Sequence, residues 1–181
     1  MGTIGTVEPS SEDELRRVDR TFAFIDLSGF TAFTGVEGDG AAVRVLENFR
    51  RIVRRVVARR GVRIAKWLGD GAMLVGVEPE QTVESVVDIE ALIHDSELPL
   101  PLRAGIARGP VLLIEGDDHI GDAVNLAARL CQMAQPHQVL APASLLSSLM
   151  VNTVERPIGD RDIYGFAEPL FIVELLPADR S

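Results

Sequence analysis

Two residues whose side chains could take part in binding or catalysis, Asn125 and Arg129, lie four positions apart in the segment 118–129. The run over 124–131 favours a helix, and residues four apart on a helix share one face. A side-chain amide and a guanidinium fixed on one face are suited to binding a ribose and a phosphoryl group. This interpretation requires carboxylates elsewhere in the chain that can bind a metal ion.

Asp26 and Asp70 are the candidates for those carboxylates. Asp26 ends an apolar strand predicted over 21–26, and Asp70 lies at the tip of a hairpin predicted between 62–68 and 72–77. Hard cations such as Mg²⁺ prefer oxygen ligands and commonly take one or two carboxylates together with substrate phosphates. Helix capping or turn chemistry would explain each aspartate alone. As a pair, they favour two metal ions that support in-line displacement at phosphorus.

Three further features would complete a nucleotide site. The segment 28–31 follows Asp26 and leads into a helix, where backbone amides can hold phosphates; the residues concerned are Gly29, Phe30 and Thr31. Lys66 interrupts an apolar strand, so it either snorkels at the strand end or reaches into a pocket. Asp118 is either a plain turn residue or an acceptor that reads a nucleobase.

The elements that must position these residues alternate between strands and helices. Strands are expected over 21–26, 62–68, 72–77, 100–108, 111–115, 138–140 and 170–175, and near Ile163. Helices are expected from a glycine-rich turn to Gly61, and over 79–94, 124–131 and 144–150. This order predicts an α+β fold, ferredoxin-like (palm-type), with helices packed on a mixed sheet. We expect a polar leader over 1–20 and one domain over 21–177.

The remaining polar residues carry weaker signals. The arginines between 50 and 60 are expected to form a solvated helix face. His94, His119 and His137 show no metal-ligand spacing and are expected at the surface or in loops. Cys131 is expected to be a small core residue.

Bulk composition restricts the functional class. With 181 residues, 46% of them hydrophobic and 25% charged, the chain suits one soluble globular domain. The net charge of −9 argues against a nucleic-acid polymer as partner. A single cysteine allows no internal disulfide, and no apolar run suits membrane insertion. The sequence therefore predicts a cytoplasmic protein.

Three blocks of the sequence together resemble the signature blocks of class III nucleotide cyclase catalytic domains, bacterial adenylate cyclases among them. The blocks lie at 26–31, 66–71 and 118–129, and the resemblance covers about residues 21–175 in order and spacing. The resemblance implies the class III cyclase fold and conversion of ATP into 3′,5′-cyclic AMP and pyrophosphate. Each block alone is only suggestive, but the three together are specific.

The resemblance also implies a role for each matching residue. Asp26, Asp70 and the backbone carbonyl of Leu27 would bind two divalent cations, Mg²⁺ or Mn²⁺. Lys66 and Asp118 would select adenine over guanine. Asn125 would orient the ribose, and Arg129 would stabilise charge on the transferring phosphoryl group.

In that family the metal-binding aspartates and the other site residues come from different subunits. Because this chain carries both sets, a homodimer with two shared sites is implied. One departure is Tyr164, which occupies a position where a basic residue is common. The alternatives are a cyclase of guanylate or mixed specificity, and a catalytically silent module that dimerises or binds nucleotide.

Overall fold

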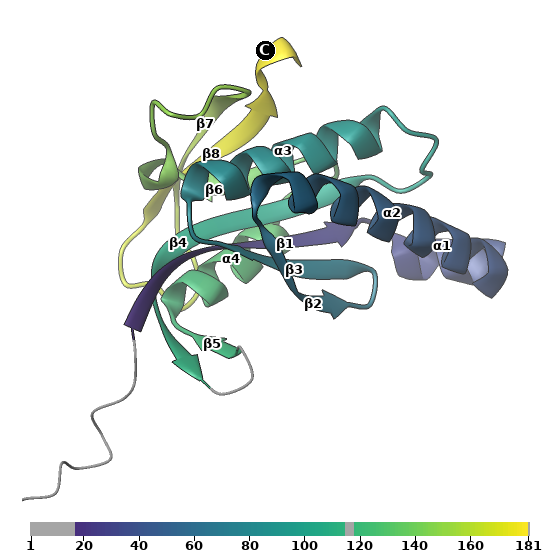
Figure 1. Cartoon of the computed structure of the whole chain (residues 1–181), viewed down its shortest axis with the longest axis horizontal. Helices are drawn as coiled ribbons and strands as arrows, with labels where there is room; N and C mark the ends of the chain where they lie inside the picture. The colour runs from purple at the N-terminus through teal and green to yellow at the C-terminus, as the bar shows by residue number, and fades with distance from the viewer. Residues whose placement is uncertain (1–16, 115–117, 181) are drawn as a thin grey trace, which may run out of the picture.

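The computed structural model describes residues 17–114 and 118–180, and it folds around one twisted sheet (Figure 1). Eight strands form this sheet in the order β2-β3-β1-β4-β6-β8-β7, with β5 paired to β4. Only the β4–β6 pairing among the described strands is parallel. The strands are β1 (Arg17–Leu27), β2 (Arg63–Leu68), β3 (Gly71–Gly76), β4 (Leu102–Ile114), β5 (Asp118–Ile120), β6 (Val139–Pro142), β7 (Thr153–Arg161) and β8 (Leu170–Pro177).

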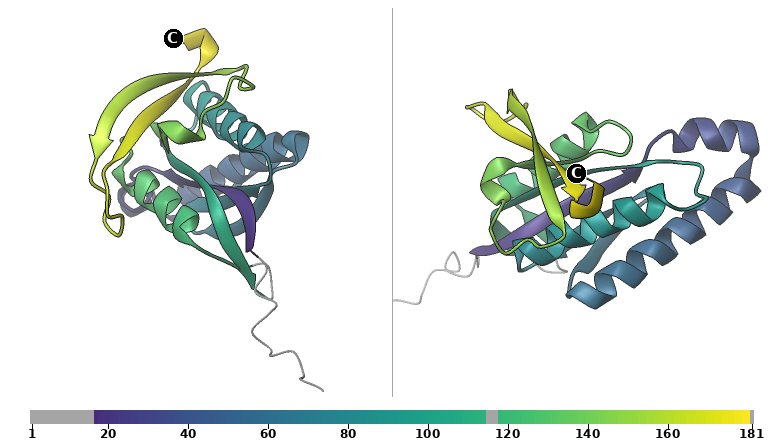
Figure 2. Two further views of the ribbon diagram at one scale, coloured as in Figure 1. Left: turned by 90° about the vertical axis from the view of Figure 1, so that its left-hand side faces the viewer. Right: turned by 90° about the horizontal axis from the view of Figure 1, so that it is seen from above.

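Helices cover both faces of the sheet, as the views in Figure 2 show. One hydrophobic core joins the sheet to α2 and α3, and a second joins the opposite face to α4. The short α1 lies beside α2 and buries none of its residues. The helices are α1 (Phe30–Glu37), α2 (Asp39–Arg60), α3 (Pro79–His94) and α4 (Asp122–Met133). The predicted α+β fold with helices on a mixed sheet is confirmed.

Strand alternation divides the side chains of β1 between the two cores. Ala23, Ile25 and Leu27 pack in the core under α2 and α3, whereas Phe22 belongs to the core under α4. Because successive side chains on a strand point to opposite faces, Asp26 lies on the α4 side of the sheet. Its orientation therefore follows from the apolar pattern that precedes it.

Helix α4 approaches the sheet closely at one glycine. A Cβ atom built at Gly105 of β4 would lie 2.2 Å from the backbone nitrogen of Cys131 and 2.3 Å from the carbonyl oxygen of Ala127. A side chain at this position would push the helix away from the strand. Gly105 thus fixes how near α4, with Asn125 and Arg129, lies to β4.

The structure corrects several predicted boundaries. β1 begins at Arg17, so residues 17–20 are strand rather than leader; the rest of the predicted leader, 1–16, lies outside the described residues. The two strands expected at 100–108 and 111–115 are one strand, β4. Pro110 does not break it, because β1 is the only described strand paired with β4 at that point, and proline is tolerated on such an edge.

Two other predicted elements differ from those observed. The helix expected over 144–150 is a single 3₁₀ turn, Ala143–Leu145. The strand expected near Ile163 is β7, which ends at Arg161, and Ile163 instead is a buried residue of the following loop. Among the described residues, no helix is both long enough and apolar enough to cross a membrane.

Candidate functional site

The register of two neighbouring strands brings Asp26 and the Asp70 turn together. Asp26 of β1 lies opposite Gly71, the first residue of β3. The backbone N–H of Leu27 donates a 3.2 Å hydrogen bond to the carbonyl oxygen of Asp70. A Cβ atom at Gly71 would lie 2.5 Å from the carbonyl oxygen of Ile25, so only glycine permits this close approach. The two predicted metal-binding carboxylates are therefore neighbours.

The charges around these carboxylates suit a divalent cation. Burial raises the pKa of the Asp70 carboxyl, and the negative charge of Asp26 raises it further, although the backbone of Asp70 and Arg103 act in the opposite direction. Two carboxylates that repel each other in this way form an oxygen-rich donor set, which Mg²⁺ and Mn²⁺ prefer. The residues present thus fit the cations that the sequence implies.

Arg103, which sequence reasoning missed, binds one of the two acids directly. Its Nε and Nη2 atoms lie 3.0 Å and 2.7 Å from Oδ2 of Asp26. This hydrogen bond raises the pKa of the Arg103 guanidinium. The available signal was a charged residue between the apolar Leu102 and Ala104 of a predicted strand, but only the β1–β4 register reveals its partner.

The turn that carries Asp70 is braced by α2. Arg50 and Arg54 lie over the ring of Trp67, at 5.0 Å and 5.3 Å from its centroid. Arg50 also donates a 3.3 Å hydrogen bond to the carbonyl oxygen of Gly69. These two arginines therefore do more than form a solvated face, because they hold the strand and turn that present Asp70.

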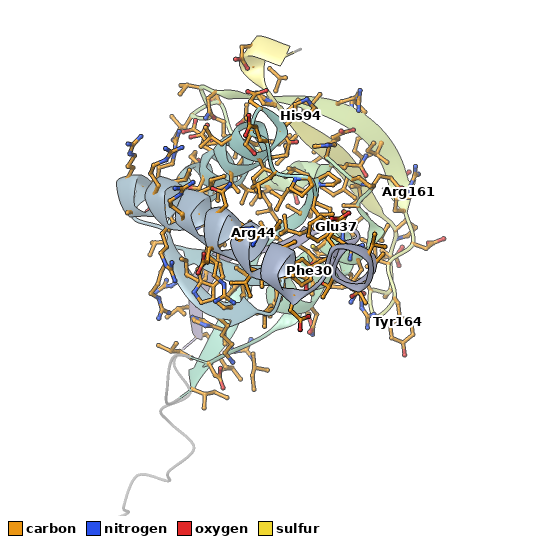
Figure 3. All side chains as sticks on the ribbon, turned by 90° about the vertical axis from the view of Figure 1, so that its right-hand side faces the viewer. Phe30, Glu37, Arg44, His94, Arg161 and Tyr164 are labelled. Atoms are coloured by element: carbon orange, nitrogen blue, oxygen red, sulfur yellow. The ribbon has the colours of Figure 1, made fainter. Side chains whose placement is uncertain are left out.

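The segment predicted to hold phosphates does begin a helix. Gly29 precedes α1, and Phe30 and Thr31 are the first two residues of that helix. Figure 3 looks onto this end of the molecule and labels Phe30. Gly29 and Thr31 are exposed and Phe30 is partly buried, so the first turn of α1 is accessible directly after Leu27.

Lys66 and Asp118 meet although they lie 52 residues apart in sequence. The Lys66 ammonium forms an ion pair with Oδ1 of Asp118, and both side chains are about half exposed. The hydrogen bond from Lys66 lowers the pKa of the Asp118 carboxyl. A β-bulge in β2 just before Lys66 and the pairing of β5 with β4 bring the two side chains together.

Asn125 and Arg129 lie on the exposed face of α4, four residues apart as predicted. The Arg129 guanidinium lies 5.0 Å from the ring centroid of Tyr164, which is 83% exposed. Tyr164 extends outward at the edge of the molecule (Figure 3). Tyr164, the residue at which the sequence departs from the resemblance, therefore contacts Arg129.

The two ends of β4 lead to different site residues. Arg103, the second residue of β4, contacts Asp26, whereas Ile114, its last residue, pairs with Asp118. A hollow of about 540 Å³ lies elsewhere, lined by residues that include Arg108, Leu126 and Leu145, and its lining contains none of the predicted site residues. The Lys66 and Asp118 side chains are about half exposed, whereas the Asp26 side chain is 24% exposed.

Comparison with known proteins supplies sequence relatives. No family model matches the chain. It is 37% identical over 152 residues to an uncharacterized protein of Mycobacterium tuberculosis, covering 84% of this chain and 40% of that protein. It is 33% identical over 159 residues to an adenylate cyclase of Streptomyces coelicolor, covering 86% of this chain and 41% of that protein. The chain thus spans about two fifths of the length of these relatives.

Solved structures match the fold more completely. The adenylyl cyclase CyaB of P. aeruginosa superimposes with a TM-score of 0.79 at 22% identity, over 90% of this chain and 96% of that one. The catalytic core of a rhodopsin-guanylyl cyclase with converted specificity, in complex with ATPαS, gives 0.80 at 19% identity, over 90% and 98%. By its sequence relatives and its fold, the chain belongs to the class III nucleotide cyclase catalytic domains.

Proposed function

We propose that this chain is the catalytic domain of an adenylate cyclase, which converts ATP into 3′,5′-cyclic AMP and pyrophosphate at sites shared by two copies. The observation that supports this most strongly is the ion pair between Lys66 and Asp118. A lysine donor beside a carboxylate acceptor complements ring nitrogen N1 and the exocyclic amine of adenine. Guanine presents a donor and a carbonyl at those positions and would face mismatched groups. Because ATP is the proposed substrate, we place the domain in the cytoplasm.

Asp26, Asp70 and the carbonyl of Leu27 would hold two divalent cations, Mg²⁺ or Mn²⁺. When bound, these cations lower the pKa of the ribose 3′-hydroxyl and neutralise phosphate charge. Arg103 binds Oδ2 of Asp26, which leaves Oδ1 for a cation and fixes the orientation of the carboxylate. The paired arginine thus acts as a positioning residue for the first acid.

The remaining residues would bind the nucleotide and the developing charge. The amides of Gly29, Phe30 and Thr31 at the start of α1 would hold the β- and γ-phosphates. Asn125 would orient the ribose for in-line attack on the α-phosphorus. Arg129 would place positive charge where negative charge develops in the transition state, which is where electrostatic stabilisation is most effective.

A homodimer would bring the two groups of residues together. The acids lie at one end of β4 and Asp118 at the other, so one chain presents two complementary half-sites. A symmetric dimer would join each half-site to its complement and create two equivalent sites. Exposed apolar side chains on β4 and β5, at Leu113, Ile114 and Ile120, would be covered in such an assembly.

Nucleotide turnover by the purified chain tests the proposal. ATP and GTP are supplied separately with Mg²⁺ or Mn²⁺, and cyclic product and pyrophosphate are quantified. We expect cyclic AMP from ATP, and its loss in Asp70→Ala. Sedimentation of the same sample establishes whether the chain is dimeric. A dimer that forms no cyclic product from either nucleotide would contradict the proposal.

A second candidate function is a catalytically silent module that binds nucleotide or dimerises. Two contacts favour it: Arg103 occupies one oxygen of Asp26, and Arg129 lies against Tyr164. In a silent module, the first contact would reduce the capacity of Asp26 to bind a cation, and the second would hold Arg129 away from phosphate. Calorimetry that detects nucleotide binding, together with assays that detect no turnover, would support this function over catalysis. Turnover should also stay absent in Arg103→Lys and Tyr164→Lys.

A further inference from the structure

A second group of potential metal ligands lies at the C-terminal end of α3. Glu90 and His94 are one helical turn apart, and His137 reaches them from the turn before β6. Nδ1 of His137 lies 3.1 Å from Oε1 of Glu90 and 3.2 Å from Nδ1 of His94, and Nδ1 of His94 lies 3.8 Å from Oε1 of Glu90. Three donor atoms from two segments thus converge on one point.

These separations match the spacing of ligands around a tetrahedral ion. With metal–ligand bonds of about 2.0 Å, the edges of a tetrahedral site measure about 3.3 Å. Two of the three observed edges fall within a few tenths of an ångström of that length, and the third is about half an ångström longer. The donors would need only a small movement to ligate one cation.

The burial and chemistry of the three side chains also favour a cation. The Glu90 side chain is only 8% exposed, and a cation beside a buried carboxylate offsets part of the cost of its burial. The two imidazoles turn the same nitrogen, Nδ1, toward each other. A hydrogen bond between those nitrogens requires a proton on one of them, whereas a metal ion would use the lone pairs of both.

The group is separate from the acids of the proposed catalytic site. Glu90 and His94 belong to α3, which covers one face of the sheet, whereas Asp26 points to the opposite face. In Figure 3 the labelled His94 lies well away from Phe30, which begins α1 shortly after the end of the strand that carries Asp26. The ligand types differ as well, because imidazole selects zinc-like ions and paired carboxylates select Mg²⁺ or Mn²⁺.

We propose that Glu90, His94 and His137 bind one transition-metal dication of the zinc class, with the fourth position open to water. The two histidine side chains are 49% and 42% exposed, which leaves access for the ion and for a water ligand. The backbone N–H of His137 donates a 2.7 Å hydrogen bond to the carbonyl oxygen of Leu102, the residue before Arg103. A bound ion would therefore clamp α3 to the start of β4. This site does not depend on the proposed catalytic activity.

Cobalt binding to the full, tag-free chain tests this site. The Asp26→Asn/Asp70→Asn variant, stripped with a chelator, removes the competing carboxylate pair while keeping all three ligands. Titration with Co²⁺ is followed by visible absorption, and Zn²⁺ is then added in competition. We expect one equivalent of Co²⁺ with the intense bands of four-coordinate cobalt, and its displacement by Zn²⁺.

Ligand variants in the same background decide which residues bind the ion. His94→Ala changes an exposed helix position, and His137→Asn suits the positive φ of 64° at that residue. Each should weaken Co²⁺ affinity by at least about tenfold, since even supporting residues of metal sites have effects of that size. Glu97→Gln, an exposed acid just beyond α3, is the matched control and should bind as before. Equal affinity in His94→Ala, His137→Asn and Glu97→Gln, or no saturable binding at all, would overturn the proposal.

Discussion

The two proposed half-sites of this domain are built in opposite ways. Strand register, the close approach at Gly71 and the partly buried Arg103 hold the acids in place. The fold of the sheet therefore sets the positions of Asp26 and Asp70. The side chains of Lys66 and Asp118, which we propose to read the base, are about half exposed, and a β-bulge and the short strand β5 position them. The comparison teaches that the geometry of the proposed metal-binding half is set by folding, whereas we expect that the half proposed to recognise the base can be altered with little effect on the fold.

The largest effect is expected when one variant chain is defective in the acids and another chain is defective in Arg129. Asp26→Asn and Arg129→Ala should each lower kcat by about a thousandfold, because several kcal/mol of transition-state stabilisation is lost. When the two variants are mixed and exchange subunits, half the dimers are mixed and carry one intact site. About one quarter of the wild-type activity should therefore return, if each site draws on both chains. Measured cyclic AMP formation that stays at the level of the separate variants would place each site within one chain.

The next effect concerns the choice of base. Lys66→Glu/Asp118→Gly should lower kcat/KM for ATP by about a hundredfold, since two hydrogen bonds of about 1.5 kcal/mol each are lost. The ratio of GTP to ATP turnover should rise, while the melting temperature stays near that of wild type because both side chains are exposed. Competition assays with both nucleotides measure the ratio. An unchanged ratio would remove these residues from base selection.

The two acids should have opposite effects on stability. Asp26→Asn removes the ion pair with Arg103 and should lower the free energy of unfolding by about 1–3 kcal/mol. Asp70→Asn should raise it at neutral pH, because burial raises the pKa of Asp70 above its ordinary 3.8 and its charged form is therefore disfavoured in the folded state. A raised acid pKa costs stability as pH increases through the folded pKa, so the advantage of Asp70→Asn should vanish below about pH 4. Urea denaturation at pH 4 and pH 7 without divalent cations measures both differences.

The smallest expected effect lies at Tyr164. A cation–π contact at an exposed site contributes about 0.5–1 kcal/mol. Tyr164→Ala should therefore lower kcat/KM for ATP by about two- to fivefold. Tyr164→Phe retains the ring and should behave as wild type in steady-state kinetics. A loss in Tyr164→Phe as large as in Tyr164→Ala would assign the effect to the hydroxyl instead of the ring.

Sequence reasoning anticipated most elements that carry the site, because their apolar periodicity is strong. The predicted helix 79–94 coincides with α3, and the hairpin that presents Asp70 is within one residue of its predicted bounds. The continuity of β4 was missed, since Gly109-Pro110 resembles a break and only pairing with β1 carries the strand through it.

Contacts between distant segments could not be predicted in the same way. Arg103 meets Asp26 across 77 residues, and His137 meets Glu90 across 47. Neither pair leaves a local spacing signal, because both depend on the order of strands in the sheet and on where α3 ends. Lys66 and Asp118 were paired only on the basis of the family resemblance, because the hydrophobic periodicity of the sequence does not require them to meet.

The unbroken course of β4 has a consequence for how the two sites of a dimer would communicate. In the proposed assembly, the start of β4 supports the acids of one site and its end supports the base-reading residue of the other. A strand is stiff along its length. Closure around a nucleotide at one site would therefore displace one end of β4, and the other end would move with it. Occupation of the first site would then alter the affinity of the second, and turnover would depend on ATP concentration with a Hill coefficient different from one.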